Sequence, residues 1–259
     1  MSSKLVRSQI AGTAATFAVF TITALIVYGP ALRGPFVSDD LHYVATNPYV
    51  HALSAESLRQ IFDPSGPASI FVVNYTPVHL LLHAIAWSLF GPQVLGHHVL
   101  NVVLHAAGAT LLALVFRASG LGRLACLAGG AIFLLHPANV EAVAWISQLK
   151  STSCLALSLA ALLVFPSSPA LATPLFFLAL LAKPTASFLL PVVTTLIWVR
   201  LWRERPPIRH LIWLGVWTAG FLILAVAQVV VNRRSGTPEL LPPADDLARL
   251  LSVAAIALR

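Results

Sequence analysis

The sequence predicts an all-α integral membrane protein, and its composition and apolar segments lead to this prediction. Of the 259 residues, 58% are hydrophobic and only 10% are charged, whereas an ordinary globular domain carries about 25% charged residues. The mean hydropathy is +0.85. Several stretches approach the roughly 20 apolar residues that a helix needs to cross a bilayer. One water-soluble core could not bury this much apolar sequence, so we expect a bundle of membrane-spanning helices.

About eight apolar segments are candidate spans. The first follows Lys4 and Arg7 and is too long for a cleaved signal peptide, so we expect it to remain as a span. Two further segments, 76–91 and 138–150, are short or more polar, and we expect them to be juxtamembrane helices. The candidate spans are residues 10–28, 94–116, 124–136, 152–165, 170–182, 185–199 and 211–231, and a last segment that begins near Leu247.

The placement of charged residues predicts the orientation of these spans. Lys and Arg are retained on the cytoplasmic side of a membrane, so we expect the arginine-rich loop of residues 200–209 to be cytoplasmic. Because the segments alternate in direction, this places the N-terminus in the cytoplasm as well. This orientation makes residues 31–75 an external loop. It also places these acidic residues outside: Asp39, Asp40, Glu56, Asp63, Glu141, Glu239, Asp245 and Asp246. The cytoplasmic placement of most basic residues explains the net charge of +7, so we expect no nucleic-acid partner. Arg33, Arg59, Arg233 and Arg234 are exceptions, because this orientation places them outside.

The adjacent carboxylates Asp39 and Asp40, just beyond the first span, are the strongest candidate site. An Asp at the centre of a bilayer costs about 2.5–3.5 kcal/mol, and neighbouring carboxylates repel each other. The pair therefore belongs at the interface or in a wet cavity. There it could bind a divalent cation, or one carboxylate could act as a general base while the other orients it. A solvated turn with a helix-capping role is the structural alternative.

Three other polar groups have both a functional and a structural interpretation. If residues 138–150 form one helix, Glu141 and Trp145 share a face suited to a sugar, or to the membrane interface. A stripe containing His98, Asn101 and His105 predicts hydrogen bonds between helices. Lys183 either reaches the interface or contacts a phosphate. Outside these groups, the pair His79 and His83 lacks the Glu of a zinc motif, and Cys126 and Cys154 read as packing residues.

Five motifs in order resemble the GT-C membrane glycosyltransferases. The similarity is strongest to bacterial members with tetratricopeptide tails and to the animal transmembrane O-mannosyltransferases that carry such repeats. The matching stretches are Phe36-Val37-Ser38-Asp39-Asp40 with Asn47-Pro48, Asn74-Tyr75-Thr76-Pro77, residues 97–105, residues 136–147, and Leu181-Ala182-Lys183-Pro184.

The resemblance implies an inverting enzyme with a GT-C-like helical bundle. It would transfer a mannose-like sugar from a polyprenyl or dolichyl phosphate to a protein or glycan outside the cytoplasm. Asp40 or Asp39 would be the general base or a ligand of Mg²⁺ or Mn²⁺, and Lys183 and Lys150 would meet the donor phosphate. Binding of acceptor or donor would fall to Glu141, Trp145, His136, Tyr75, Asn101 and His105.

The resemblance also sets expectations about the extent and source of the chain. We expect residues 1–259 to be one transmembrane domain, cut short relative to the family and without its tetratricopeptide repeats. Arginine outnumbers lysine, and Ala, Leu and Pro are abundant. This composition suggests a GC-rich bacterial genome, and hence a bacterial inner membrane with the active site facing outward.

Three departures from the family pattern leave alternatives open. Thr76 and Leu149 stand where the family usually has Arg, and Ser151 stands where Asp is common. An Arg offers a bidentate fork for phosphate that neither Thr nor Leu can replace. The chain could therefore be a catalytically inactive relative that binds lipid phosphate or a partner protein. A secondary transporter is less consistent with the sequence, because no matching pair of broken helices is present.

Overall fold

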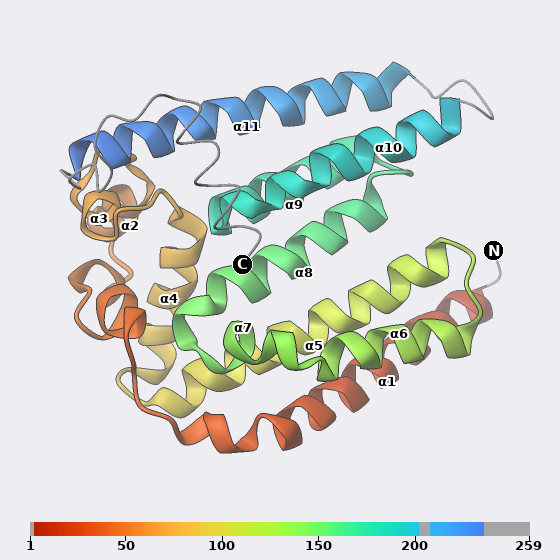
Figure 1. Cartoon of the computed structure of the whole chain (residues 1–259), viewed down its shortest axis with the longest axis horizontal. Coiled ribbons are helices and arrows are strands. Elements are labelled where there is room, and N and C mark those ends of the chain that lie inside the picture. Colours follow the sequence, from red (N-terminus) through yellow and green to blue (C-terminus); the bar gives the residue numbers. More distant parts are fainter. Residues whose placement is uncertain (1–2, 202–207, 236–259) are drawn as a thin grey trace, which may run out of the picture.

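The computed structural model describes residues 3–201 and 208–235, and this part of the chain consists of helices and their connections. The larger apolar helices run side by side along the long axis of the molecule, while four smaller helices lie toward one end (Figure 1). The larger helices are α1 (Ser3–Val27), α5 (Val94–Ala118), α6 (Arg123–Leu135), α8 (Leu149–Val164), α9 (Pro169–Ala182), α10 (Leu189–Leu201) and α11 (Ile208–Arg234). The smaller ones are α2 (Ala55–Phe62), α3 (Pro67–Phe71), α4 (Pro77–Phe90) and α7 (Val140–Ala144).

The lengths of these helices support an integral membrane protein but not eight full spans. Four are long and apolar enough to cross a bilayer: α1, α5, α11 and the helix over Ile146–Val164. A fifth is possible only if α6 and Pro137–Ala144, which are bent by 51°, form one broken span. α9 has 14 residues, or about 21 Å, against a hydrocarbon core of about 30 Å. The segment expected from Leu247 lies outside the described residues.

The helix directions bring the carboxylates of the described residues to one end of the bundle (Figure 1), although Arg33, Arg59, Lys150, Lys183, Arg233 and Arg234 lie at that end too. We call the end where α5 and α8 begin the acidic end, because Asp39, Asp40, Glu56, Asp63 and Glu141 lie there. The opposite end, where α5 stops and α6 and α11 begin, is the basic end and carries Arg117, Arg123 and Arg209. The remaining charges of the predicted pattern, Arg203, Glu204, Arg205, Glu239, Asp245 and Asp246, lie outside the described residues. Which side of the membrane each end faces stays a prediction.

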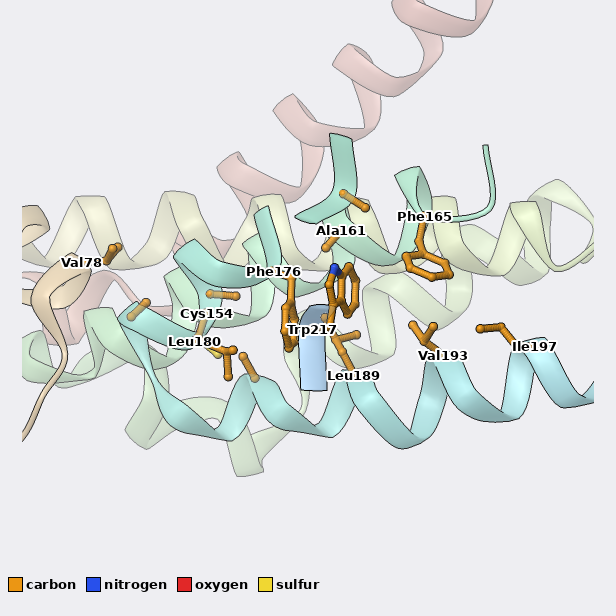
Figure 2. Packing of buried hydrophobic residues seen from close by; sticks show 14 residues of the cluster. Val78, Cys154, Ala161, Phe165, Phe176, Leu180, Leu189, Val193, Ile197 and Trp217 are labelled. Carbon is orange, nitrogen blue, oxygen red and sulfur yellow. The ribbon is translucent and has the colours of Figure 1, made fainter. Parts of the chain in front are cut away.

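A cluster of aromatic residues packs α11 onto α9 (Figure 2). The rings of Trp217 and Phe176 stack with their centroids 4.1 Å apart. The Trp217 indole N–H donates to Thr173 Oγ1 at 2.8 Å. Lipid tails are as apolar as these side chains, so ring packing and this hydrogen bond, rather than burial from water, hold the two helices together. The contact fixes α9, whose last residues lead into Lys183 at the acidic end.

One helix expected from the sequence is broken in the structure. Residues 138–150 do not form a single helix, because Trp145 has an extended backbone (φ −90°, ψ 120°) between α7 and the 3-10 turn η5 (Ile146–Gln148). The predicted face shared by Glu141 and Trp145 is therefore wrong. Two other expectations are confirmed: residues 77–90 form helix α4, and Cys126 and Cys154 are free and buried.

The orientation can be tested by labelling single cysteines in a chain whose Cys126 and Cys154 are replaced by Ala. We expect Ala55→Cys, exposed at the acidic end, to react with a membrane-impermeant maleimide in intact cells. Arg209→Cys, exposed at the basic end, should react only after the membrane is permeabilised. Labelling of Arg209→Cys from outside intact cells would reverse the predicted topology.

Candidate functional site

The polar stripe of α5 anchors three backbone segments of the acidic end. All three of its side chains are buried, and each is hydrogen-bonded to a backbone carbonyl contributed by another part of the chain. The acceptors are Gly34 O for His98 Nε2 (3.1 Å), Trp145 O for Asn101 Nδ2 (2.8 Å) and Leu134 O for His105 Nε2 (3.0 Å). The predicted hydrogen bonding of this stripe is confirmed. Asn101 and His105, offered as ligand-binding residues, are occupied by the scaffold.

Asp40 fastens the first loop to the turn that precedes α8. Its side chain is 1% exposed, and its two oxygens accept from backbone N–H groups of Ser147 (2.6 Å) and Val37 (3.1 Å). The Trp145 indole adds a third link by donating to Val37 O at 3.2 Å. Burial raises the pKa of the Asp40 carboxyl, while the two backbone donors oppose that shift. Asp40 is thus enclosed and held by the backbone.

Asp39 has the opposite environment, because its side chain is exposed. Its charge acts on two neighbours, the Tyr43 phenol and the Lys150 ammonium. Lys150 Nζ lies 4.5 Å from the centroid of the Tyr43 ring. Burial raises the pKa of Tyr43, and the Asp39 carboxylate raises it further. The adjacent carboxylates are therefore divided: Asp40 points into the protein, and Asp39 remains available beside a cation and a phenol.

Two lysines meet at this place. Lys183 Nζ donates to Ser151 Oγ at 2.8 Å, and the Ser151 hydroxyl donates to Gln148 Oε1 at 2.5 Å. The Lys183 charge acts on Lys150, so the two ammonium groups repel each other. Both side chains are half-buried, and within residues 3–201 and 208–235 neither forms an ion pair. Two half-buried cations that form no ion pair favour binding of an anion.

A buried histidine pair lies next to the lysines but does not form a metal site. His79 Nε2 and His83 Nε2 are 2.8 Å apart, so one of them must donate a proton to the other. One Nε2 carries that proton and the other accepts it, so neither Nε2 has a lone pair left for a metal. Across the described part of the chain, no group of three or more His, Cys, Asp or Glu residues could hold a metal ion. The Mg²⁺ or Mn²⁺ site expected at Asp39 and Asp40 stays a prediction, and we derive no reaction step through it.

For three other residues expected from the sequence, the structure shows no contact with the lysines. Glu141 is exposed, and among the described residues its side chain makes no hydrogen bond or ion pair. His136 is exposed at the start of a 3-10 turn, where its Nδ1 accepts from Ala138 N at 3.2 Å. The Tyr75 hydroxyl donates to Phe62 O at 3.0 Å. In their place the structure brings in Tyr43, which follows Asp39 by one helical turn, a spacing visible in the sequence.

An apolar groove lies next to Pro184, the residue that follows Lys183. Its volume is about 240 Å³, and it lies between the end of α9 and the second half of α11. Pro184, the residue after Lys183, is part of its wall, so a ligand could have its charge at Lys183 and its apolar part in the groove. The other walls include Tyr75, Leu180, Leu181, Phe221 and Leu224.

The two positions at which the sequence resemblance would lead one to expect arginine are enclosed by protein. Thr76 is 1% exposed, and its hydroxyl has no hydrogen-bond partner among the described residues. Leu149 is 2% exposed. Neither position supplies a cation to the site, which leaves Lys150 and Lys183 as the positive charges identified there.

Comparison with known proteins gives partial similarity to protein O-mannosyltransferases. Protein O-mannosyl-transferase Tmtc1 of Drosophila melanogaster is 31% identical over 151 residues, which cover 56% of this chain and 17% of the relative. Protein O-mannosyl-transferase F38B6.6 of Caenorhabditis elegans is 30% identical over 153 residues, covering 54% and 21%. The chain thus spans about a fifth of the length of these relatives. No family model matches, and no solved structure matches. The similarity supports a relationship to glycosyltransferases.

The different roles of the two aspartates predict different effects on stability. Asp40→Ala removes a charged acceptor from one buried and one partly buried N–H group, and we expect it to lower the free energy of unfolding by about 1.5–3 kcal/mol. Asp39→Ala, at an exposed position, should change it by less than about 0.5 kcal/mol. Unfolding in mixed detergent micelles provides the measurement. Equal effects of the two substitutions would contradict the division of roles.

Proposed function

We propose that this chain contains the reaction centre of a membrane glycosyltransferase that transfers a mannose-like sugar from a polyprenyl or dolichyl phosphate to a protein or glycan hydroxyl. The observation that carries the proposal is the pair of half-buried lysines without an ion-pair partner, next to the exposed Asp39. The partial similarity to protein O-mannosyltransferases points in the same direction. The reaction would take place on the extracytoplasmic side, as the charge pattern predicts.

The lysines and the groove fit the two parts of such a donor. Lys150 and Lys183 would bind the phosphate and stabilise the negative charge that it gains as the bond to the sugar breaks. Ser151 and Gln148 hold the Lys183 ammonium in place. The groove beside Pro184 would receive the first units of the polyprenyl chain, since its lining is mainly apolar.

Asp39 is the better candidate for the general base. As the acceptor oxygen attacks the anomeric carbon, its proton would pass to the Asp39 carboxylate, and the bond to the phosphate oxygen would break on the opposite face. A single displacement of this kind inverts the anomeric centre. Asp40 would act as a positioning residue, because both of its oxygens are hydrogen-bonded to the backbone. The sequence alone left the choice between the two aspartates open.

A second candidate function is supported by the positions that lack arginine. With Thr76 and Leu149 buried and uncharged, the site has fewer phosphate donors than the family pattern implies. A catalytically inactive relative could still bind lipid phosphate through Lys150 and Lys183, or bind a partner protein. Location in a bacterial inner membrane stays a prediction from composition, since the two relatives compared above are animal proteins.

The assignment of the base can be tested by sugar transfer from a polyprenyl-phosphate donor in membranes. Asp39→Asn cannot take up a proton, so we expect activity to fall about 10²–10⁴-fold while membrane insertion and stability are unchanged. Glu56→Gln, which alters an exposed carboxylate of the same loop, is the matched control and should keep full activity. Full activity in Asp39→Asn would rule out its role as base. Donor binding without transfer in the parent protein would favour the inactive relative.

The lysines are expected to act on the donor. Lys150→Met and Lys183→Met keep the length of the side chain but remove the charge, so the KM for the lipid-phosphate donor should rise in each variant. Arg59→Gln removes an exposed cation at the same end of the bundle and should leave the KM unchanged. Unchanged donor KM in both lysine variants would contradict the proposed phosphate site.

A further inference from the structure

A second, larger cavity lies far from the lysines, at the basic end of the bundle. Its volume is about 1250 Å³, and its walls come mainly from α1, α5 and α6. The apolar side chains that form it include Ile10, Phe17, Leu111, Leu114 and Leu127, and two arginines belong to its lining, Arg117 and Arg123. We propose that this cavity binds one anionic phospholipid from the leaflet that surrounds the basic end.

Two threonine hydroxyl groups in the cavity wall are hydrogen-bonded within their own helices. Thr16 Oγ1 donates to Gly12 O at 3.0 Å, and Thr110 Oγ1 donates to Ala106 O at 2.8 Å. Each hydroxyl is thus bonded to the backbone of its own helix, so its methyl group remains for contact with a ligand. An acyl chain can lie against such a wall without burying an unsatisfied donor.

The cavity has the depth of one lipid leaflet. Its lining on α5 extends from Ala107 to Ala118. This length of helix rises about 16 Å, roughly half of a hydrocarbon core of about 30 Å. An acyl chain could therefore lie along α5 with its headgroup at the arginines.

The two arginines that line the cavity favour a lipid with an anionic headgroup. Arg117 and Arg123 are exposed, and neither forms an ion pair among the described residues. One nitrogen of Arg117 donates to Leu121 O at 3.1 Å, and the rest of its guanidinium remains free to bind a phosphate oxygen. An uncharged apolar helix could cover the walls but would leave both guanidinium groups without a counter-ion. A lipid with net negative charge satisfies both parts of the cavity, and such lipids are concentrated in the cytoplasmic leaflet, which the predicted orientation places here.

Native mass spectrometry of the purified chain can test the proposal with phosphatidylglycerol and phosphatidylcholine as probes. We expect the parent protein to bind phosphatidylglycerol more tightly. Each cation near a membrane surface contributes about five-fold in affinity, so Arg117→Gln with Arg123→Gln should weaken phosphatidylglycerol binding by about 25-fold and leave phosphatidylcholine binding nearly unchanged. Arg209→Gln, at an exposed arginine of α11 outside the cavity, is the matched control and should have little effect.

A substitution in the wall distinguishes this cavity from a general attraction to basic surfaces. A Cβ atom at Gly12 would meet no other heavy atom within 4 Å, so a side chain can start there without a clash, and the ring of Gly12→Phe would narrow the cavity. We expect it to reduce binding of both lipids, with thermal stability unchanged. No preference for phosphatidylglycerol in the parent, an equal loss in Arg209→Gln, or full lipid binding in Gly12→Phe would each overturn the proposal.

Discussion

The structure of the acidic end depends on hydrogen bonds to backbone N–H and C=O groups that lose their helical partners where helices break. Helices that end near the hydrocarbon core expose N–H and C=O groups, which cost several kcal/mol each if water cannot reach them. Here the breaks occur at the loop after α1, at the end of α6 and around Trp145. Buried side chains of α5 bind a carbonyl at each of the three breaks, and Asp40 binds an N–H at two of them.

This requirement determines which of the polar residues remain free for chemistry. A side chain whose hydrogen-bonding atoms are occupied by buried backbone cannot give them up to a ligand without leaving polar groups unpaired. Asp40 and Asn101 are in that position. Asp39, Lys150 and Lys183 are not, since they are exposed or half-buried and bind no main-chain group in the described residues. The residues available for chemistry at this end are therefore those that form few hydrogen bonds with the protein backbone.

The sequence predicted the features that depend on residue type and helical spacing. Apolar runs located the larger helices, and the charge pattern placed the described carboxylates at one end of the bundle. The spacing of His98, Asn101 and His105 indicated a stripe that forms hydrogen bonds with neighbouring segments. It could not predict the break at Trp145, because Val140 to Lys150 contains no Gly or Pro to mark it. Tertiary hydrogen bonds to Trp145 O and Ser147 N stabilise that break. Nor could the sequence predict that Asp40 is buried and Asp39 exposed, because the burial of Asp40 depends on residues more than 100 positions away.

Unpaired cations at opposite ends of one bundle have a common energetic consequence. Lys150 and Lys183 repel each other in a half-buried setting, so the unliganded acidic end is less stable than it would be with an anion between them. A phosphate that binds there removes the repulsion, and the folded state gains stability in proportion to ligand occupancy. The arginines at the basic end are exposed, so solvent and salt screen them and an anion adds less. Ligand binding and local folding should therefore be coupled more strongly at the lysines than at the arginines.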